Sequence, residues 1–295
     1  MIVKNKAFNL AAHLFVGFLI VICIVPFWLL IISSFTSEAE LLRNGYSLIP
    51  QKLSFVTYEF LWTMKDGVLR AYLMSVIISV TGVASNVVLT TLFAYPLSRR
   101  DLPGRGAISI FLFVTMLFNG GLVPTYLIYT QVFHIKDTLA GMIIPGLLMN
   151  AFHIIMMRTY INSNISDEIM ESARIDGAGE FRCLWSVVLP LSKPILGTLA
   201  LMTFIAYWNN WTNGIYYIQQ RTELYGIQNY LKRIMDTATT MQQQMSQGYN
   251  VDPTTVPTVG IRMALAVVAV VPVLLIYPFF QKSFVKGITL GSVKG

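Results

Sequence analysis

The sequence predicts an all-α membrane protein with six transmembrane helices, and composition gives the first reasons. Hydrophobic residues make up 55% of the 295-residue chain and charged residues only 12%, whereas a soluble domain carries about 25% charged residues. The mean hydropathy is +0.62. So much apolar surface cannot be hidden in one soluble core, which excludes a soluble enzyme. The third reason is the arrangement of apolar residues in runs of the length that crosses a bilayer, about 20 residues.

The apolar runs define one transmembrane domain over residues 1–295. We expect spans at about 10–33, 71–97, 107–130, 138–161, 194–219 and 259–282. At about 1.5 Å per helical residue, each run is long enough to cross the hydrocarbon core. The first run follows Lys4 and Lys6. It is too long for a signal peptide and lacks a clear cleavage site, so we interpret it as a retained helix.

Basic residues in the connections predict the orientation. The net charge is +7, and the short connection 98–106 contains Arg99, Arg100 and Arg105. Cytoplasmic loops are enriched in Lys and Arg, and short loops carry the most weight. Both termini are therefore expected in the cytoplasm, and the positive charge is interpreted as a topology signal rather than as a nucleic-acid site.

The predicted spans contain no Asp or Glu, so they lack the carboxylates that proton-coupled carriers place at membrane depth. The third span is interrupted by Asn119-Gly120-Gly121 and Pro124. Such breaks indicate either a transport path or ordinary helix kinking. Further prolines within the spans are Pro26, Pro96, Pro145, Pro272 and Pro278.

The connection 162–193 predicts two short helices that meet at a tight corner. Ser166 is suited to cap the first helix, and Asp167 and Glu168 suit the positive end of its dipole. Asp176-Gly177 predicts the stop. In the second helix, one apolar stripe is expected at i, i+3, i+4 and i+7, formed by Phe181, Leu184, Trp185 and Val188. The pattern alone fits either a docking surface for another protein or an amphipathic hairpin on the membrane.

The same connection resembles the EAA loop of ABC importer permeases. The resemblance rests on Glu171-Ser172-Ala173, Gly177, Val187 and Leu189-Pro190. Ser172 stands where the family usually has Ala. The segments 97–104, 118–126 and 286–295 are similar to the branch that imports oligosaccharides and polysaccharide fragments.

The resemblance implies a type I ABC importer permease fold with cytoplasmic coupling helices, in the bacterial inner membrane. It implies a second homologous permease, two ATP-binding subunits and an extracytoplasmic sugar-binding protein as partners. The chain has no G-x-x-x-x-G-K-S/T loop. ATP and Mg are thus expected in the partner ATPases, with no cofactor in this chain, which is not itself an enzyme. The ATPase-coupling residues it implies are Glu171, Ser172, Ala173, Asp176, Gly177, Ala178, Phe181 and Trp185.

The end of the fifth span is the candidate substrate path. Saccharides present apolar faces and hydroxyls, so their sites combine aromatic rings with amides. The candidates are Trp208, Asn209, Asn210, Trp211, Asn213 and Tyr216, with Asn119 from the third span. An interfacial aromatic belt with helix-packing amides is the alternative. No metal site is expected, because His13, His134 and His153 lack metal-ligand spacing.

The outer connection 220–258 is polar, and it is either a contact for the binding protein or simply a mobile loop. Its basic residues Arg221, Lys232 and Arg233 favour an acidic substrate such as alginate or pectin fragments. The alternative function is a secondary carrier or channel that acts without an ATPase. Such a carrier should show inverted repeats or a carboxylate near the midplane, and neither is evident in the sequence.

Overall fold

A computed structural model describes residues 6–50, 52–246 and 258–292. Within this part the chain is helical, without a β-strand, and one isolated bridge joins Thr36 to Leu53. The chain divides into two compact units. The first comprises Met1–Gly67 with Leu231–Pro272, and the second comprises Val68–Tyr230 with Val273–Gly295. Each unit is described by itself.

The first unit contains α1 (Lys6–Ser34), α2 (Glu38–Asn44) and α3 (Val56–Thr63). Helix α1 continues through Pro26. No residue in its most apolar stretch is buried within the chain. A helix that is apolar all round belongs in a membrane or against another chain. Helix α1 is therefore suited to contact lipid or a partner subunit.

The first unit also holds most of α14 (Ile227–Ser246) and the start of α15 (Thr258–Ser292). The carboxylate of Glu38 accepts hydrogen bonds from the backbone amides of Val259, at 2.8 Å, and Gly260, at 2.9 Å. A helix leaves its first amides unpaired, and a negative charge suits that end of its dipole. Glu38 therefore caps α15 from α2.

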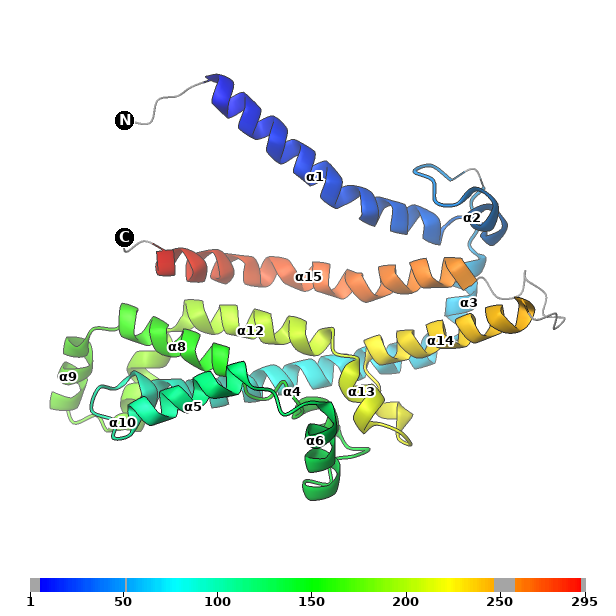
Figure 1. The fold of residues 1–295 in the computed structure, drawn as a ribbon. Helices are drawn as coiled ribbons and strands as arrows, with labels where there is room; N and C mark the ends of the chain where they lie inside the picture. Colours follow the sequence, from blue (N-terminus) through cyan, green and yellow to red (C-terminus); the bar gives the residue numbers. More distant parts are fainter. Residues whose placement is uncertain (1–5, 51, 247–257, 293–295) are drawn as a thin grey trace. The chain divides into compact units, whose positions relative to one another are not determined.

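The second unit is built on four helices that run alongside one another (Figure 1). They are α4 (Lys65–Ser98), α5 (Arg105–Leu117), α8 (Ala151–Asn164) and α12 (Lys193–Trp208). Both α5 and α12 pack against α8. The core at their shared end includes Leu97, Ile154, Met157 and Leu199, all nearly inaccessible. This core is the platform for the candidate site.

The third predicted span is broken where its sequence indicates. Helix α5 ends at Leu117, and the chain resumes as α6 (Leu122–Leu127) and the π-helix η1 (Ile128–Val132). The two parts make an angle of 113°. Gly121 has φ of +85°, a conformation that glycine adopts without strain. The break therefore follows from local sequence.

The fourth predicted span is also broken, between α7 (Leu139–Ile143) and α8. Side chains from other helices donate to the carbonyls around the break. Asn86 Nδ2 donates to Leu147 O at 2.9 Å and to Leu148 O at 3.0 Å. Tyr207 OH donates to Ile143 O at 2.9 Å. Unpaired carbonyls cost several kcal/mol in a membrane, so these donors make a non-helical segment tolerable there.

The fifth predicted span is not one continuous helix. Helix α12 ends at Trp208, and α13 (Thr212–Tyr217) follows after three residues. Asn209 and Asn213 therefore do not share one helical face, because the helical repeat stops between them. Asn213 anchors α13 instead, with Nδ2 donating to Met142 O at 3.2 Å and Pro145 O at 3.1 Å.

Two helices of the described residues are long and apolar enough to cross a membrane, Phe8–Ser34 and Lys65–Ser98. Two bent pairs bring the number to four if each is one broken span: Arg105–Leu117 with Leu122–Val132, and Glu180–Leu191 with Lys193–Trp208, bent by 80°. The described part thus supports at least two crossings.

Candidate functional site: a hairpin at the end of the helices

The candidate site is the hairpin formed by residues 166–191, whose first arm is α9 (Asp167–Ile175). Ser166 is its N-cap residue, as predicted, but the Ser166 hydroxyl makes no capping hydrogen bond. The stop at Asp176-Gly177 is confirmed, since Gly177 has φ of +80°. Gly177 N donates to Arg174 O at 2.9 Å and Ala178 N to Ala173 O at 3.0 Å. These two bonds define a Schellman motif, which fixes the corner.

The second arm comprises α10 (Glu180–Cys183), the π-helix η2 (Leu184–Val188) and α11 (Leu189–Leu191). The expected single apolar stripe is wrong. Leu184 and Val188 are 5% and 0% exposed, whereas Phe181 and Trp185 are 82% and 74% exposed. The period of 3.6 residues behind that stripe does not hold through a π-helix. The arm therefore has a buried apolar side and a separate exposed one.

Both arms are fastened to the four-helix platform by apolar packing. Met170 of α9 and Cys183, Leu184 and Val188 of the second arm belong to the same core as Leu97 and Met157. Ala173 and Ala178 pack against this core from the corner. Figure 1 shows α9 and α10 together at one end of the platform. The hairpin is thus supported from beneath rather than suspended on loops.

A polar network ties the hairpin to the end of α4. Glu180 Oε2 accepts a hydrogen bond from Tyr95 OH at 2.5 Å. Glu180 Oε1 accepts from Arg174 Nε at 3.1 Å, with a second bond from Arg174 Nη2. Asp101 Oδ2 lies 3.9 Å from the same Arg174 nitrogen. One carboxylate therefore joins α4, α9 and α10.

The same network holds Glu180 ionised. The Tyr95 hydroxyl and the Arg174 guanidinium lower the pKa of Glu180 below its ordinary value, because both stabilise the carboxylate. The Arg174 pKa is raised in turn by its bonds to Glu180. The ion pair is accordingly complete at neutral pH. No local pattern predicts this network, because Tyr95 and Glu180 are 85 positions apart.

The exposed surface of the hairpin includes three large apolar side chains. Ile175 is 86% exposed, next to the corner, and it joins Phe181 and Trp185 in exposing a large side chain to solvent. Glu171, Asp176 and Gly177 are exposed as well. Ser172 Oγ donates to Ile169 O at 3.0 Å. Exposed apolar side chains on a fixed support are available to contact another protein.

Some of the substrate-path candidates are buried and others are exposed. Trp208 is 2% exposed and stacks on Phe204, with ring centroids 5.6 Å apart. Asn213 is buried and anchors α13, and Asn210 Oδ1 accepts from Asn213 N at 2.9 Å. Asn209 and Trp211 are exposed, and Tyr216 is half-buried. In the third span, exposed Asn119 accepts from Gly121 N at 2.9 Å.

Metal ligands do not gather anywhere in residues 6–50, 52–246 and 258–292, where no group of three His, Cys, Asp or Glu side chains occurs. The two cysteines are free, with Cys23 exposed and Cys183 buried.

The fold defines a helical membrane protein, with the hairpin packed against one end of its helices. Residues 60–290 match the family of binding-protein-dependent transport system inner membrane components. The chain belongs to this family. Its members are transporter subunits, and the chain is accordingly a permease subunit and not an enzyme.

Similar proteins cover the whole chain. The polygalacturonan/rhamnogalacturonan transport system permease protein YtcP of Bacillus subtilis is 37% identical, over 99% of this chain and 100% of YtcP. Protein LplC of B. subtilis is 33% identical over 99% of this chain and 96% of its own. A bacterial ABC transporter involved in the import of the acidic polysaccharide alginate has a chain that superposes with a TM-score of 0.78 at 26% identity. That match covers 96% of this chain and 99% of the other. The fold is therefore that of an ABC importer permease.

Proposed function

We propose that the chain is the permease subunit of an ATP-driven importer of oligosaccharides or polysaccharide fragments, and that the hairpin docks on an ATPase subunit. The observation that carries the proposal is the exposed apolar set Ile175, Phe181 and Trp185 on a firmly packed base. The partners are a second permease, two ATPases that bind ATP and Mg, and a sugar-binding protein. The membrane topology is six crossings with both termini and the hairpin in the cytoplasm.

Alternating access requires that movement of the ATPases reaches the spans. A rigid element that is fixed to the helices can transmit such a movement, whereas a loose loop would absorb it. The shared core and the bonds of Glu180 to Tyr95 and Arg174 make the hairpin such an element. Closure of the ATPase pair on ATP would then rotate the helices through the hairpin.

The docking role is tested with Phe181→Ala and Trp185→Ala in the assembled transporter. Aromatic side chains at the centre of an interface commonly contribute 2 kcal/mol or more, about thirtyfold in affinity. We expect each variant to lose most of the ATP hydrolysis that is stimulated by the loaded binding protein. The permease should still reach the membrane, because both side chains are exposed.

Trp62→Ala is the matched control for these variants. Trp62 is a comparably exposed aromatic residue, at 70%, and it lies on α3 outside the hairpin. Its loss should leave the stimulated hydrolysis unchanged. Equal activity of the Trp185→Ala, Phe181→Ala and Trp62→Ala variants would refute the docking role.

We propose an acidic saccharide as the substrate. YtcP is named for polygalacturonan and rhamnogalacturonan, and the structural neighbour imports alginate, an acidic polysaccharide. Of the basic residues noted in the sequence, Arg221 pairs with Glu223 at 2.8 Å and Lys232 with Asp236 at 3.1 Å, while Arg233 is exposed. Two of these charges are locally neutralised. The proposal of an acidic substrate therefore rests more on the similar proteins than on these basic residues.

The substrate class is tested by the ATP hydrolysis of the reconstituted transporter with its binding protein. Uronic-acid oligomers, neutral oligosaccharides of equal length, amino acids and inorganic ions form the panel. Stimulation by the uronic-acid oligomers is expected. Stimulation by neutral sugars alone would refute the acidic substrate but not the import of saccharides. Stimulation by amino acids or ions alone would contradict both the acidic substrate and the import of saccharides.

A further inference from the structure

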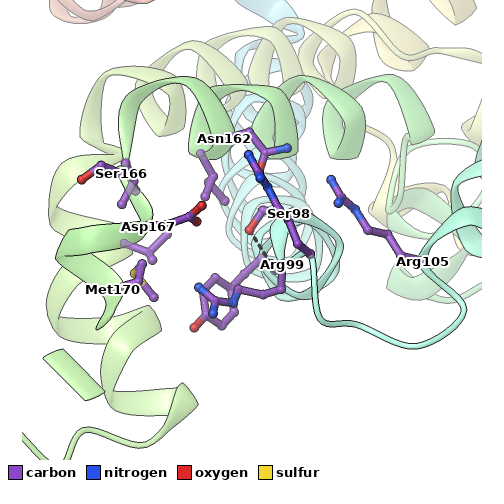
Figure 2. Close-up of a pocket in the computed structure, with 12 residues that line it drawn as sticks. Ser98, Arg99, Arg105, Asn162, Ser166, Asp167 and Met170 are labelled. Carbon is purple, nitrogen blue, oxygen red and sulfur yellow. Dashed lines mark hydrogen bonds between the residues drawn. The ribbon is translucent and has the colours of Figure 1, made fainter. Parts of the chain in front are cut away.

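A cavity of about 320 Å³ lies beside the hairpin, within the second unit. It is formed where α4 ends, along the connection to α5, and where α8 gives way to α9. Figure 2 shows Ser98 and Arg99 between the start of α9, with Ser166 and Asp167, and Arg105 on the opposite side. The cavity has room for several water molecules, each with about 30 Å³ in the liquid. A group the size of a phosphate therefore fits.

The cavity has an excess of positive charge. Arg99, Arg100 and Arg105 line it, against the single carboxylate of Asp167. Asp101 lies outside the lining, 3.5 Å from Arg99 Nε, and is 67% exposed, so solvent screens it. Like charges that share a cavity repel one another unless an anion lies between them. The charge balance therefore favours an anionic ligand.

One of the arginines carries an unsatisfied buried donor. Arg99 Nε is inaccessible to solvent and has no hydrogen-bond partner, since Asp101 at 3.5 Å is too distant for a good bond. Buried N–H groups are nearly always paired, with protein, water or an ion. This donor is a second observation, independent of the charge count, that indicates a missing acceptor.

Other lining residues add donors, and Arg105 among them has a fixed support. Arg105 Nε donates to Leu97 O at 2.9 Å, which positions the guanidinium without using its terminal nitrogens. The Ser166 hydroxyl makes no capping bond, and the Asn162 amide also lines the cavity. Ser98 Oγ and Tyr95 OH are already engaged, with Tyr95 O and Glu180. Arginine forks of this kind match the oxygen geometry of phosphate.

We propose that this cavity binds a phosphate-type oxyanion. The bound oxyanion accepts hydrogen bonds from Arg99, Arg100 and Arg105 and joins the connection between α4 and α5 to the start of the hairpin. Its source is either the headgroup of an anionic phospholipid or free inorganic phosphate, which share the same recognising chemistry. The site is separate from the exposed apolar surface of Phe181 and Trp185, and binding there does not depend on the proposed substrate.

The test measures binding to the full-length chain, purified with the subunits that accompany it. One arm uses native mass spectrometry after incorporation into bilayers of phosphatidylcholine with phosphatidylglycerol. The other arm uses equilibrium dialysis with radiolabelled inorganic phosphate. Arg100→Gln and Arg105→Gln remove lining charges. Arg182→Gln is the control, since Arg182 is an exposed arginine of α10 outside the lining.

Loss of one charge-assisted bond should weaken binding about tenfold. We expect both lining variants to lose retained phosphatidylglycerol or bound phosphate by that factor while Arg182→Gln keeps it. The probe whose binding is lost, phosphatidylglycerol or inorganic phosphate, identifies the source of the oxyanion. Arg100 makes no ion pair within the described residues, so Arg100→Gln should fold even if Arg105→Gln does not. Failure of the unmodified protein to bind either probe, or equal binding by Arg100→Gln and Arg182→Gln, would overturn the site.

Discussion

At the scale of single residues, three side chains and one glycine fix the hairpin. Glu180 accepts hydrogen bonds from Tyr95 on one oxygen and from Arg174 on the other. Gly177 holds a positive φ that completes the Schellman motif. The glycine was predictable from Asp176-Gly177, a local stop signal. The Glu180 network was not, because its partners meet only after α4 and the hairpin pack.

Gly177→Ala tests the corner. A side chain at φ of +80° costs about 1–2 kcal/mol, although the space around a Cβ at Gly177 is open. We expect reduced coupling of ATP hydrolysis to substrate in Gly177→Ala. In Gly177→Trp, whose bulk would also project from the exposed corner, coupling should be abolished although the protein reaches the membrane.

Gly179→Ala is the control for the corner, since Gly179 has φ of −70° and also has open space around it. It should keep normal coupling. If Gly177→Ala and Gly179→Ala behaved alike, the conformation of the corner would have no role in coupling.

Glu180→Gln tests the network. The hydrogen bonds to a half-exposed carboxylate should contribute no more than about 1 kcal/mol, so a small decrease in melting temperature is expected. A double-mutant cycle with Tyr95→Phe should show coupling between the two positions. Additive effects of the two substitutions would mean that the bond does not stabilise the fold.

The direction of the Glu180 pKa shift determines how its contribution to stability depends on pH. The pKa of Glu180 is lowered in the folded protein, from an ordinary value of 4.5. Its stabilisation is thus complete above about pH 4.5 and is lost as the pH falls through the lowered pKa. The melting temperatures of the unmodified protein and Glu180→Gln should converge in acid, and a gap that widened there would contradict the assignment.

At the scale of elements, one helix break was predictable from local sequence, whereas another depends on contacts with distant helices. The break between α5 and α6 was predictable from Asn119-Gly120-Gly121, because glycine and proline act locally. The extent of the break between α7 and α8 was not, although Pro145 marks it. Its carbonyls are satisfied by Asn86, Tyr207 and Asn213 from α4, α12 and α13. The sequence allowed two roles for Asn213, a substrate contact or a helix-packing amide. In the structure its amide packs α13 against the carbonyls of this break.

Asn86→Leu tests the support of this break. The change leaves two carbonyls without their donors, which we expect to cost about 3 kcal/mol. The melting temperature of the purified transporter in detergent should fall markedly. Thr203→Val is the milder comparison, because it removes one bond to Asn86 Oδ1, of 3.1 Å, and keeps the side-chain shape. An effect of Asn86→Leu no larger than that of Thr203→Val would show that the carbonyls find other partners.

At the scale of the whole molecule, composition and the spacing of one connection were sufficient to predict the class of protein. Low charge and long apolar runs predicted the membrane helices, and the connection 162–193 indicated the family. The side of each hairpin residue was not predictable, because η2 changes the helical period and the packing on Leu97 and Met157 decides which residues are buried. The outcome is a hairpin with Phe181 and Trp185 outward and Leu184 and Val188 inward.

The most direct test of the account is photo-crosslinking from position 181 in intact cells. A photoreactive amino acid in place of Phe181, which is 82% exposed, is expected to form an adduct with an ATP-binding subunit, and a cysteine at the same position should resist a membrane-impermeant reagent added from outside. Labelling from outside, or irradiation that yields no adduct with an ATP-binding subunit, would contradict the claim that an ATPase drives this permease through the hairpin.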